Sequence, residues 1–254
     1  MIIFIIVVIT YKCIGKSNTK LLGEPKYIYL KINKGDNMDI KNNLILALDV
    51  MSESEAIEIC DSIKEHIDTI KIGYPLALAE GLEIINKLKD KFGFKVICDF
   101  KVADIDATNS KICDETFKAG ADAIICHGFV GSDSVQACLD MANKHKKELF
   151  LLTEMSHPGA KMFLQKNADA IAKMGVEMGI KNYVAPATRL DRLSDIRNIV
   201  GNDSYIISPG VGKQGGDGKK TLEYSNAIIV GRSIYESDNP KLACENLIKS
   251  LDKN

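Results

Sequence analysis

The stretch Lys95-Val-Ile-Cys-Asp-Phe-Lys101 changes from apolar to charged within one short run of the sequence. Its first residues are mostly apolar and partly β-branched, which favours a β-strand. Because side chains alternate between the two faces of a strand, Asp99 and Lys101 share one face with Ile97, and the other face is wholly apolar. We therefore expect a strand that packs its apolar face against helices and carries a carboxylate and an ammonium at its carboxyl end.

Short apolar runs of this kind recur along the chain on both sides of this stretch. The predicted strands are residues 44–48, 69–72, 95–98, 123–126, 149–152, 182–184, 205–207 and 227–230. The segments between them show helical spacing with charged faces, as in residues 54–66 and 133–144. Nearly continuous apolar strands that alternate with helices are typical of a parallel sheet buried on both faces. Eight such units in about 210 residues fit a closed barrel better than an open sheet, so we predict an α/β protein with a single-domain (β/α)8 TIM barrel.

An open dinucleotide-binding sheet is the main alternative fold. That fold places a glycine-rich phosphate-binding turn directly after its first strand. Here the first strand is followed by Asp49-Val-Met-Ser52, which contains no glycine. The sequence therefore favours the barrel.

The composition is that of an ordinary globular protein, with 46% hydrophobic residues among 254 and a formal net charge of -1. Such a charge, with no run of Lys and Arg among aromatic residues, disfavours a nucleic-acid partner. The seven cysteines form no CxxC pair and no Cys/His cluster with metal-ligand spacing. We therefore predict reduced thiols, a cytoplasmic location and no bound metal.

The first 37 residues differ from the rest of the chain. Residues 1–11 are almost wholly apolar, and this run is about half the length that crosses a bilayer. Neither a basic segment before it nor a clear cleavage site after it indicates a signal peptide. We divide the chain into a non-core leader, residues 1–37, and a catalytic barrel, residues 38–254. Our hypothesis is that Met38 is the native start and the leader a gene-model artefact; a weak membrane tether is the alternative, and no membrane partner is otherwise expected.

Charged side chains stand at the ends of the first three predicted strands. Asp49 ends the first, Lys71 the second, and Asp99 and Lys101 the third, with Asp104 just beyond. Buried charges are costly unless paired, and opposite unit charges about 4 Å apart interact by roughly 4 kcal/mol at an effective dielectric of about 20. We expect Lys71 and Asp104 to balance Asp99 and Lys101 at the barrel mouth. An inert ion-pair network is the alternative, but buried pairs are weak sources of stability, so a catalytic role is favoured.

Two glycine-rich segments follow the seventh and eighth predicted strands, residues 208–218 and 230–233. These loops form the usual phosphate site of a (β/α)8 barrel, because glycines let backbone N–H groups approach an anion. Arg232 can donate two parallel hydrogen bonds to phosphate oxygens, and Gln214 lies in a loop long enough to form a lid. An ordinary flexible turn is the alternative. His127 and His157 also follow strands, but neither has a metal-ligand or nucleophile partner at recognisable spacing, so structural roles are expected for both.

The segment Asp99-Phe-Lys101-Val-Ala-Asp104, preceded by Lys71, resembles the signature of the orotidine 5'-monophosphate decarboxylase family, and most of all its archaeal branch. The resemblance extends from about Leu44 to Tyr235. Further motifs that carry it are Leu-Thr-Glu-Met-Ser156-His-Pro-Gly, Ala-Pro-Ala-Thr-Arg189, Pro209-Gly-Val-Gly-Lys-Gln214-Gly-Gly-Asp and Val-Gly231-Arg232-Ser. One departure is Asp106, where the family often has proline, at a position on which the chemistry does not rely.

This resemblance implies a carboxy-lyase that converts orotidine 5'-monophosphate (OMP) to UMP and CO2 in de novo pyrimidine biosynthesis, without a metal or cofactor. It implies that Lys71 and Asp49 contact the ribose, that Ser156 bonds the pyrimidine edge, and that a homodimer brings Asp104 and Thr108 into the partner's active site. The expected catalytic residues are Lys71, Asp99, Lys101 and Asp104. The expected substrate-binding residues are Asp49, Lys71, Ile105, Thr108, Ser156, Pro209, Gln214, Gly231 and Arg232.

Lys101 is the expected general acid. Loss of CO2 from C6 of the pyrimidine leaves a carbanion with no adjacent carbonyl, and most enzymes that face this use a cofactor as electron sink. No cofactor motif is visible in the sequence, so we expect the Lys101 ammonium to stabilise the carbanion and then protonate it. Asp99, close to the leaving carboxylate, is expected to raise the ground-state energy by repulsion.

Two other functions remain open on the sequence. A sugar-phosphate decarboxylase or hexulose-phosphate synthase of the same suprafamily shares Asp-x-Lys-x-x-Asp, but such enzymes depend on Mg2+ and carry an acidic ligand where Lys71 stands. A non-catalytic nucleotide-binding module would need no lysine beside the substrate carboxylate. An absorbance assay with OMP, run with and without EDTA, separates the three.

Overall fold

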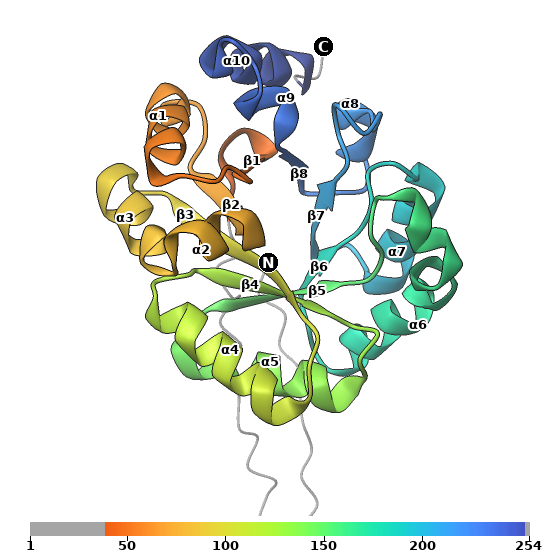
Figure 1. Cartoon of the computed structure of the whole chain (residues 1–254). Helices are drawn as coiled ribbons and strands as arrows, with labels where there is room; N and C mark the ends of the chain where they lie inside the picture. The colour runs from red at the N-terminus through yellow and green to blue at the C-terminus, as the bar shows by residue number, and fades with distance from the viewer. Residues whose placement is uncertain (1–38, 252–254) are drawn as a thin grey trace, which may run out of the picture. The chain divides into compact units, whose positions relative to one another are not determined.

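Eight strands follow one another along the chain in this computed structural model, which describes residues 39–251. They are β1 (Leu44–Ala47), β2 (Thr69–Gly73), β3 (Lys95–Val102), β4 (Ala123–His127), β5 (Glu148–Leu152), β6 (Asn182–Val184), β7 (Tyr205–Pro209) and β8 (Ala227–Val230). Each strand pairs in parallel with the next, and β8 pairs with β1, so that the sheet closes into a barrel (Figure 1). The predicted (β/α)8 architecture is confirmed.

Helices connect the strands and cover the outside of the barrel (Figure 1). The α-helices are α1 (Glu53–Ile63), α2 (Tyr74–Glu80), α3 (Glu83–Phe92), α4 (Asp106–Lys118), α5 (Ser132–His145), α6 (Leu164–Glu177), α7 (Leu190–Val200), α8 (Gly218–Thr221), α9 (Arg232–Tyr235) and α10 (Pro240–Leu251), and the 3-10 helices are η1 (Lys41–Asn43) and η2 (Pro158–Met162). The predicted helices at 54–66 and 133–144 correspond to α1 and α5. The hydroxyl of Ser52 accepts a hydrogen bond from the Glu55 N–H and so caps the start of α1.

The two faces of each strand serve different parts of the protein, as β2 illustrates. Ile70 and Ile72 are fully buried in the hydrophobic layer between the strands and the helices. The alternate residues Thr69 and Lys71 are buried polar side chains, and the alternation directs them into the barrel. Lys71 pairs with Ile97 of β3, and Asp99 lies two residues further along β3. The barrel interior therefore changes from apolar to charged toward the carboxyl ends of the strands.

The third strand is longer than predicted and irregular. It continues to Val102, and its register against β4 shifts between Cys98, which pairs with Ile124, and Val102, which pairs with Cys126. Three residues of β3 therefore lie against the single residue between Ile124 and Cys126. A bulge of this kind bends a strand and redirects its side chains.

The proposals for the leader, for a start at Met38 and for Cys13 concern positions outside the described residues, and they stay predictions. Among residues 39–251, no helix has both the length and the apolar character that crossing a membrane requires.

Candidate active site

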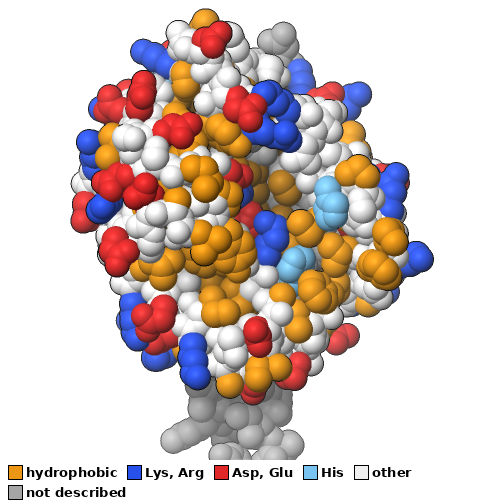
Figure 2. Space-filling view, in the orientation of Figure 1, with side chains coloured by type: hydrophobic (Ala, Val, Ile, Leu, Met, Phe, Trp, Pro, Cys, Tyr) orange, Lys and Arg blue, Asp and Glu red, His pale blue; other side chains and the backbone are white. Residues whose placement is uncertain are grey.

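A cavity of about 810 Å³ opens at the carboxyl ends of the strands. Four charged side chains line it, one just after β1 and three from β2 and β3, together with the loops that follow β5, β6, β7 and β8. Figure 2 shows the hollow, with charged side chains inside it and hydrophobic side chains around it. The predicted site residues that line this one cavity are Asp49, Lys71, Asp99, Lys101, Ser156, Pro209, Gln214, Gly231 and Arg232.

The carboxylate of Asp99 lies between two ammonium groups. Its Oδ2 is 2.7 Å from Lys71 Nζ, and its Oδ1 is 2.8 Å from Lys101 Nζ. Lys71 Nζ is also 3.9 Å from Oδ1 of Asp49. The four groups thus form a chain in which carboxylates and ammonium groups alternate, as predicted from the sequence, and Asp99 is its buried centre with 9% exposure.

Burial and charge act in opposite directions on these groups. Burial alone would raise the pKa of Asp99, but the charges and hydrogen bonds of Lys71 and Lys101 outweigh it and lower the pKa to about 2. Burial would likewise lower the pKa of Lys71, but the charges of Asp99 and Asp49 reverse the shift and raise it. Asp99 and Lys71 are therefore both ionised at neutral pH.

The backbone at Lys101 adopts a conformation that is rare for a residue with a side chain. Its φ is +44°, in the left-handed region that costs an L-residue about 1–2 kcal/mol. The residue lies within the irregular part of β3, where three residues oppose one of β4. Strained backbone that persists is characteristic of functional sites, and here it accompanies the placement of Asp99 and Lys101 side by side at the cavity.

The loops after β7 and β8 supply a part of the cavity suited to an anion. Arg232, the first residue of α9, has no ion-pair partner within residues 39–251, whereas Lys213 is paired with Glu236. Gly210 has φ +110°, and a Cβ there would come within 2.8 Å of Cγ2 of Thr188. Only glycine fits this close approach, so the loop after β7 can pass tightly beside the cavity. The guanidinium of Arg232, which has no ion pair in the described residues, is available to an anionic ligand.

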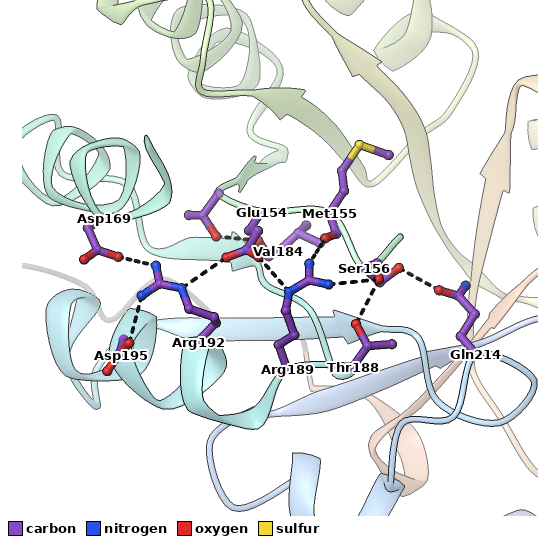
Figure 3. Close-up of polar contacts among 11 residues, drawn as sticks. Glu154, Met155, Ser156, Asp169, Val184, Thr188, Arg189, Arg192, Asp195 and Gln214 are labelled. Atoms are coloured by element: carbon purple, nitrogen blue, oxygen red, sulfur yellow. Dashed lines mark hydrogen bonds and ion pairs between the residues drawn. The ribbon is translucent and has the colours of Figure 1, made fainter. Parts of the chain in front are cut away.

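Ser156 joins the loop after β5 to the loop after β7. Its Oγ donates a hydrogen bond of 2.9 Å to Oε1 of Gln214 (Figure 3). Its carbonyl accepts hydrogen bonds from Oγ1 of Thr188 at 2.9 Å and Nη1 of Arg189 at 3.3 Å. The predicted pyrimidine contact and the predicted lid residue are thus already in contact across 58 residues of sequence.

A buried carboxylate behind Ser156 was not singled out as a functional residue from the sequence. Glu154 is fully buried, and its Oε1 is 2.8 Å from Nε of Arg189 while its Oε2 is 3.4 Å from Nε of Arg192 (Figure 3). Arg189 also donates to the carbonyl of Met155. An acidic residue two positions after an apolar strand is a signal for such a pair, because a buried carboxylate needs a cation, but the sequence does not indicate which arginine supplies it.

The segment after β3 lies outside the cavity of its own chain. Asp104 and Ile105 are exposed, Thr108 is half-buried, and none of the three lines the cavity. The expected balance between Asp104 and Lys101 within one chain is wrong, since the ion pair of Lys101 is with Asp99. Asp104 instead accepts a hydrogen bond of 2.7 Å from the Ile105 N–H, because the chain turns into α4 at this point.

The two histidines near the strand ends differ in their surroundings. His157 lines the cavity. His127 packs its ring against Phe129 at 4.6 Å between centroids, and burial, followed by the charge of Lys101, lowers its pKa to about 4. His127 is therefore a neutral ring at physiological pH, consistent with the structural role expected for it. Within residues 39–251, no group of three or more His, Cys, Asp or Glu side chains is arranged to hold a metal ion.

Comparison with known proteins gives a consistent result. Residues 42–247 match the model of the Orotidine 5'-phosphate decarboxylase / HUMPS family. The chain is 62% identical over 214 residues to the orotidine 5'-phosphate decarboxylase of Methanosphaera stadtmanae, with 84% of this chain and 99% of that protein covered. It is 52% identical over 210 residues to the enzyme of the same name from Methanosarcina mazei, with 82% and 94% covered.

Solved structures resemble the barrel as well. The crystal structure of orotidine 5'-monophosphate decarboxylase from Methanocaldococcus jannaschii complexed with inhibitor BMP matches with a TM-score of 0.79 at 47% identity, covering 83% of this chain and 98% of that one. The structure of orotidine 5'-phosphate decarboxylase from Pyrococcus horikoshii OT3 matches with a TM-score of 0.77 at 38% identity, covering 83% of this chain and all (100%) of that one.

Proposed function

Since the chain belongs to the Orotidine 5'-phosphate decarboxylase / HUMPS family, we propose that its barrel decarboxylates OMP to UMP in de novo pyrimidine biosynthesis. It is a carboxy-lyase of the orotidine 5'-phosphate decarboxylase type. The observation that carries the proposal is the position of Asp99 between the ammonium groups of Lys71 and Lys101, at 2.7 and 2.8 Å. This arrangement offers a fixed negative charge and a proton donor side by side in one cavity.

Lys101 is the proposed general acid. The bond between C6 and the carboxylate carbon breaks, CO2 leaves, and the electron pair remains on C6. The Lys101 ammonium stabilises this charge as it develops and then transfers a proton from Nζ to C6, which leaves a neutral amine that regains its proton from solvent. Because the charge is placed before the reaction begins, no reorganisation is required at the moment of bond breaking.

Asp99 is proposed to act on the bound substrate. Its ionised carboxylate would lie next to the substrate carboxylate, and their repulsion is relieved when CO2 departs. The low pKa of Asp99 supports this role, since a group with a pKa of about 2 keeps its charge throughout the working pH range.

The remaining cavity residues are proposed to bind the rest of the nucleotide. Arg232 and the glycine-rich loops would hold the phosphate, Asp49 and Lys71 the ribose, and Ser156 the pyrimidine edge. Gln214 would close over the phosphate, and its hydrogen bond to Ser156 supports a link between phosphate binding and the pyrimidine contact. Binding energy from the phosphate, remote from C6, would then favour the geometry needed for reaction.

We further propose a homodimer in which Asp104 and Thr108 complete the partner's active site. Neither lines the cavity of its own chain, which supports a contact with substrate in another subunit. Exposed hydrophobic side chains also follow the strand ends around the barrel mouth, namely Met51, Tyr74, Leu78, Ile105, Phe129, Met162 and Phe163. Such a concentration of apolar surface is typical of a protein interface.

A Mg2+-dependent sugar-phosphate reaction is disfavoured by the position of Lys71. Its ammonium occupies the space between the carboxylates of Asp49 and Asp99, at 3.9 and 2.7 Å. A divalent cation bound between those carboxylates would have to displace this ammonium or lie against a like charge. A cytoplasmic location is also proposed, on the basis of six free and buried cysteines in the described part of the chain.

The test is an absorbance assay of OMP loss with the purified full chain, in the presence and absence of EDTA. We expect turnover that EDTA does not reduce. Absence of turnover of OMP would refute the proposal, and activity abolished by EDTA and restored by Mg2+ would favour the sugar-phosphate branch.

A further inference from the structure

Asp104 is held by a buried amide that belongs to the helix following it. Asn109 is fully buried in the first turns of α4. Its Oδ1 accepts a hydrogen bond of 3.0 Å from the Asp104 N–H, and its Nδ2 donates one of 2.9 Å to the Asp104 carbonyl. One side chain thus binds both polar groups of the Asp104 backbone, in the way that one strand binds another.

A second buried side chain braces this amide from the neighbouring helix. Ser134 is 3% exposed in the first turn of α5, and its Oγ accepts a hydrogen bond of 2.6 Å from Nδ2 of Asn109. The same Oγ donates a hydrogen bond of 2.8 Å to the Asp104 carbonyl. The three residues therefore form a closed ring of hydrogen bonds in which each polar group has a partner.

The cost of this arrangement indicates a function beyond closing a loop. Burying an amide and a hydroxyl requires that every donor and acceptor be satisfied, and apolar side chains would fill the space between α4 and α5 without that requirement. What the ring fixes is the backbone of an exposed residue. The carboxylate is held as well, because its Oδ1 accepts a hydrogen bond of 2.7 Å from the Ile105 N–H.

We propose that Asn109 and Ser134 are positioning residues that hold the Asp104 carboxylate in the geometry required by the active site of the partner subunit. This inference rests on the proposed function, in which Asp104 acts across the dimer. Neither residue touches the substrate. Their effect is exerted on the other subunit, so a loss of Asn109 in one chain impairs catalysis at the site whose lysines belong to the partner.

Three single variants test the kinetic part of the inference. Asn109→Ala is expected to lower kcat by about 10- to 100-fold, as expected when a reacting group is displaced by about 1 Å. Ser134→Ala removes a single hydroxyl and is expected to act in the same direction with a smaller effect. Thr116→Ala is the matched control: Thr116 is a buried polar residue of the same helix, whose Oγ1 donates to the Ile112 carbonyl at 2.7 Å, two turns beyond Asn109. It is expected to lose stability without loss of kcat.

A subunit-complementation experiment distinguishes positioning in trans from a general structural effect. Asn109→Ala and Lys101→Ala chains with different affinity tags are co-expressed, and heterodimers are isolated by both tags. One of the two sites then combines an intact Lys101 with an Asp104 from a chain that retains Asn109. We expect such heterodimers to recover about half of the wild-type kcat per dimer, because a two-fold symmetric dimer contains two equivalent sites.

The outcomes are separable. A heterodimer no more active than the Asn109→Ala homodimer, or an Asn109→Ala kcat equal to that of Thr116→Ala, would overturn the inference. A reference heterodimer of Lys101→Ala with Asp104→Asn tests the trans arrangement itself; if it recovers nothing, that arrangement fails and the inference with it. Lack of OMP turnover by the wild-type chain would instead refute the proposed function. If Asn109→Ala does not fold, Ser134→Ala paired with Lys101→Ala carries the same comparison.

Discussion

One carboxylate organises the charged end of the barrel. Asp99 contacts an ammonium group with each of its two oxygens, and its 9% exposure leaves little access for water to replace either contact. The two lysines offset the cost of burying Asp99, and Asp99 in turn keeps the buried Lys71 charged. Substituting any one of these three residues therefore changes the electrostatic surroundings of the other two.

The stabilising effect of Asp99 should depend on pH in a defined window. Its folded pKa is about 2, below the ordinary value of 3.8, so its contribution to stability is complete above pH of about 4 and is lost as the pH falls toward 2. We expect Asp99→Asn to reduce the free energy of unfolding strongly at neutral pH and much less near pH 2. Urea unfolding of both proteins between pH 7 and 2 measures this, and a difference independent of pH would contradict it.

Lys101 should be required for turnover and dispensable for ligand binding. Lys101→Ala removes the proposed proton donor and is expected to abolish detectable decarboxylation, since the proposed mechanism assigns both carbanion stabilisation and protonation to this ammonium. Tight binding of UMP, measured by calorimetry, is expected to remain because the phosphate contacts are intact. Appreciable OMP turnover by this variant would refute the role of Lys101.

At the scale of elements, the loops after β5, β6 and β7 act as one unit. Glu154 follows β5, Arg189 precedes α7, and Gln214 lies in the loop after β7, and the contacts of Ser156 and Arg189 connect all three (Figure 3). The exposed ion pairs of this network contribute little to the free energy of unfolding, because water screens them. The buried carboxylate of Glu154 therefore contributes most to holding these loops together.

Neutralising Glu154 should therefore destabilise the protein far more than neutralising an outer partner. Glu154→Gln leaves two guanidinium groups without their buried carboxylate, and we expect a loss of about 3–5 kcal/mol in the free energy of unfolding. Asp195→Asn is the matched control: Asp195 is 54% exposed and bonds the same Arg192 at 2.8 Å, so its loss should cost less than about 1 kcal/mol. Equal effects in denaturant unfolding would show that Glu154 does not anchor these loops.

At the scale of the whole molecule, the barrel mouth combines the charged cavity with a surrounding apolar surface (Figure 2). Most of the exposed large hydrophobic side chains in the described residues follow strands at this end of the barrel, and Asp104 also lies at this end, outside the cavity of its own chain. Catalysis and association are therefore proposed to share one face. The active site would be incomplete in a single subunit.

Disrupting this face should lower both association and activity. Leu78 in α2 is 80% exposed, and Leu78→Asp is expected to shift the protein toward monomer and to reduce specific activity increasingly on dilution. Leu242→Asp in α10, at a residue that is 49% exposed, is the control and should leave both unchanged. Sedimentation velocity and activity at a series of protein concentrations provide the measurements; a fully active Leu78→Asp monomer would exclude the shared site.

Much of the architecture follows from local features of the sequence. Each apolar run between charged helices determines its own strand, and the order of the runs along the chain determines a parallel sheet whose carboxyl ends meet at one edge. Asp49, Lys71, Asp99 and Lys101 could be predicted to lie together for that reason, because strand alternation and chain order alone bring them to the same end of the barrel.

Other features depend on contacts that no local pattern encodes. Three examples depend on how distant segments pack against one another: the irregular register of β3, the pairing of Glu154 with Arg189 across 35 residues, and the position of Asp104 outside the cavity of its own chain. No sequence pattern indicates that Asn109 is buried against Asp104, because a polar residue in a helix is ordinarily exposed. The sequence alone determined which charges reach the barrel mouth, and the tertiary structure decided which of them face one another, because ion pairs and buried hydrogen bonds are selected by three-dimensional proximity.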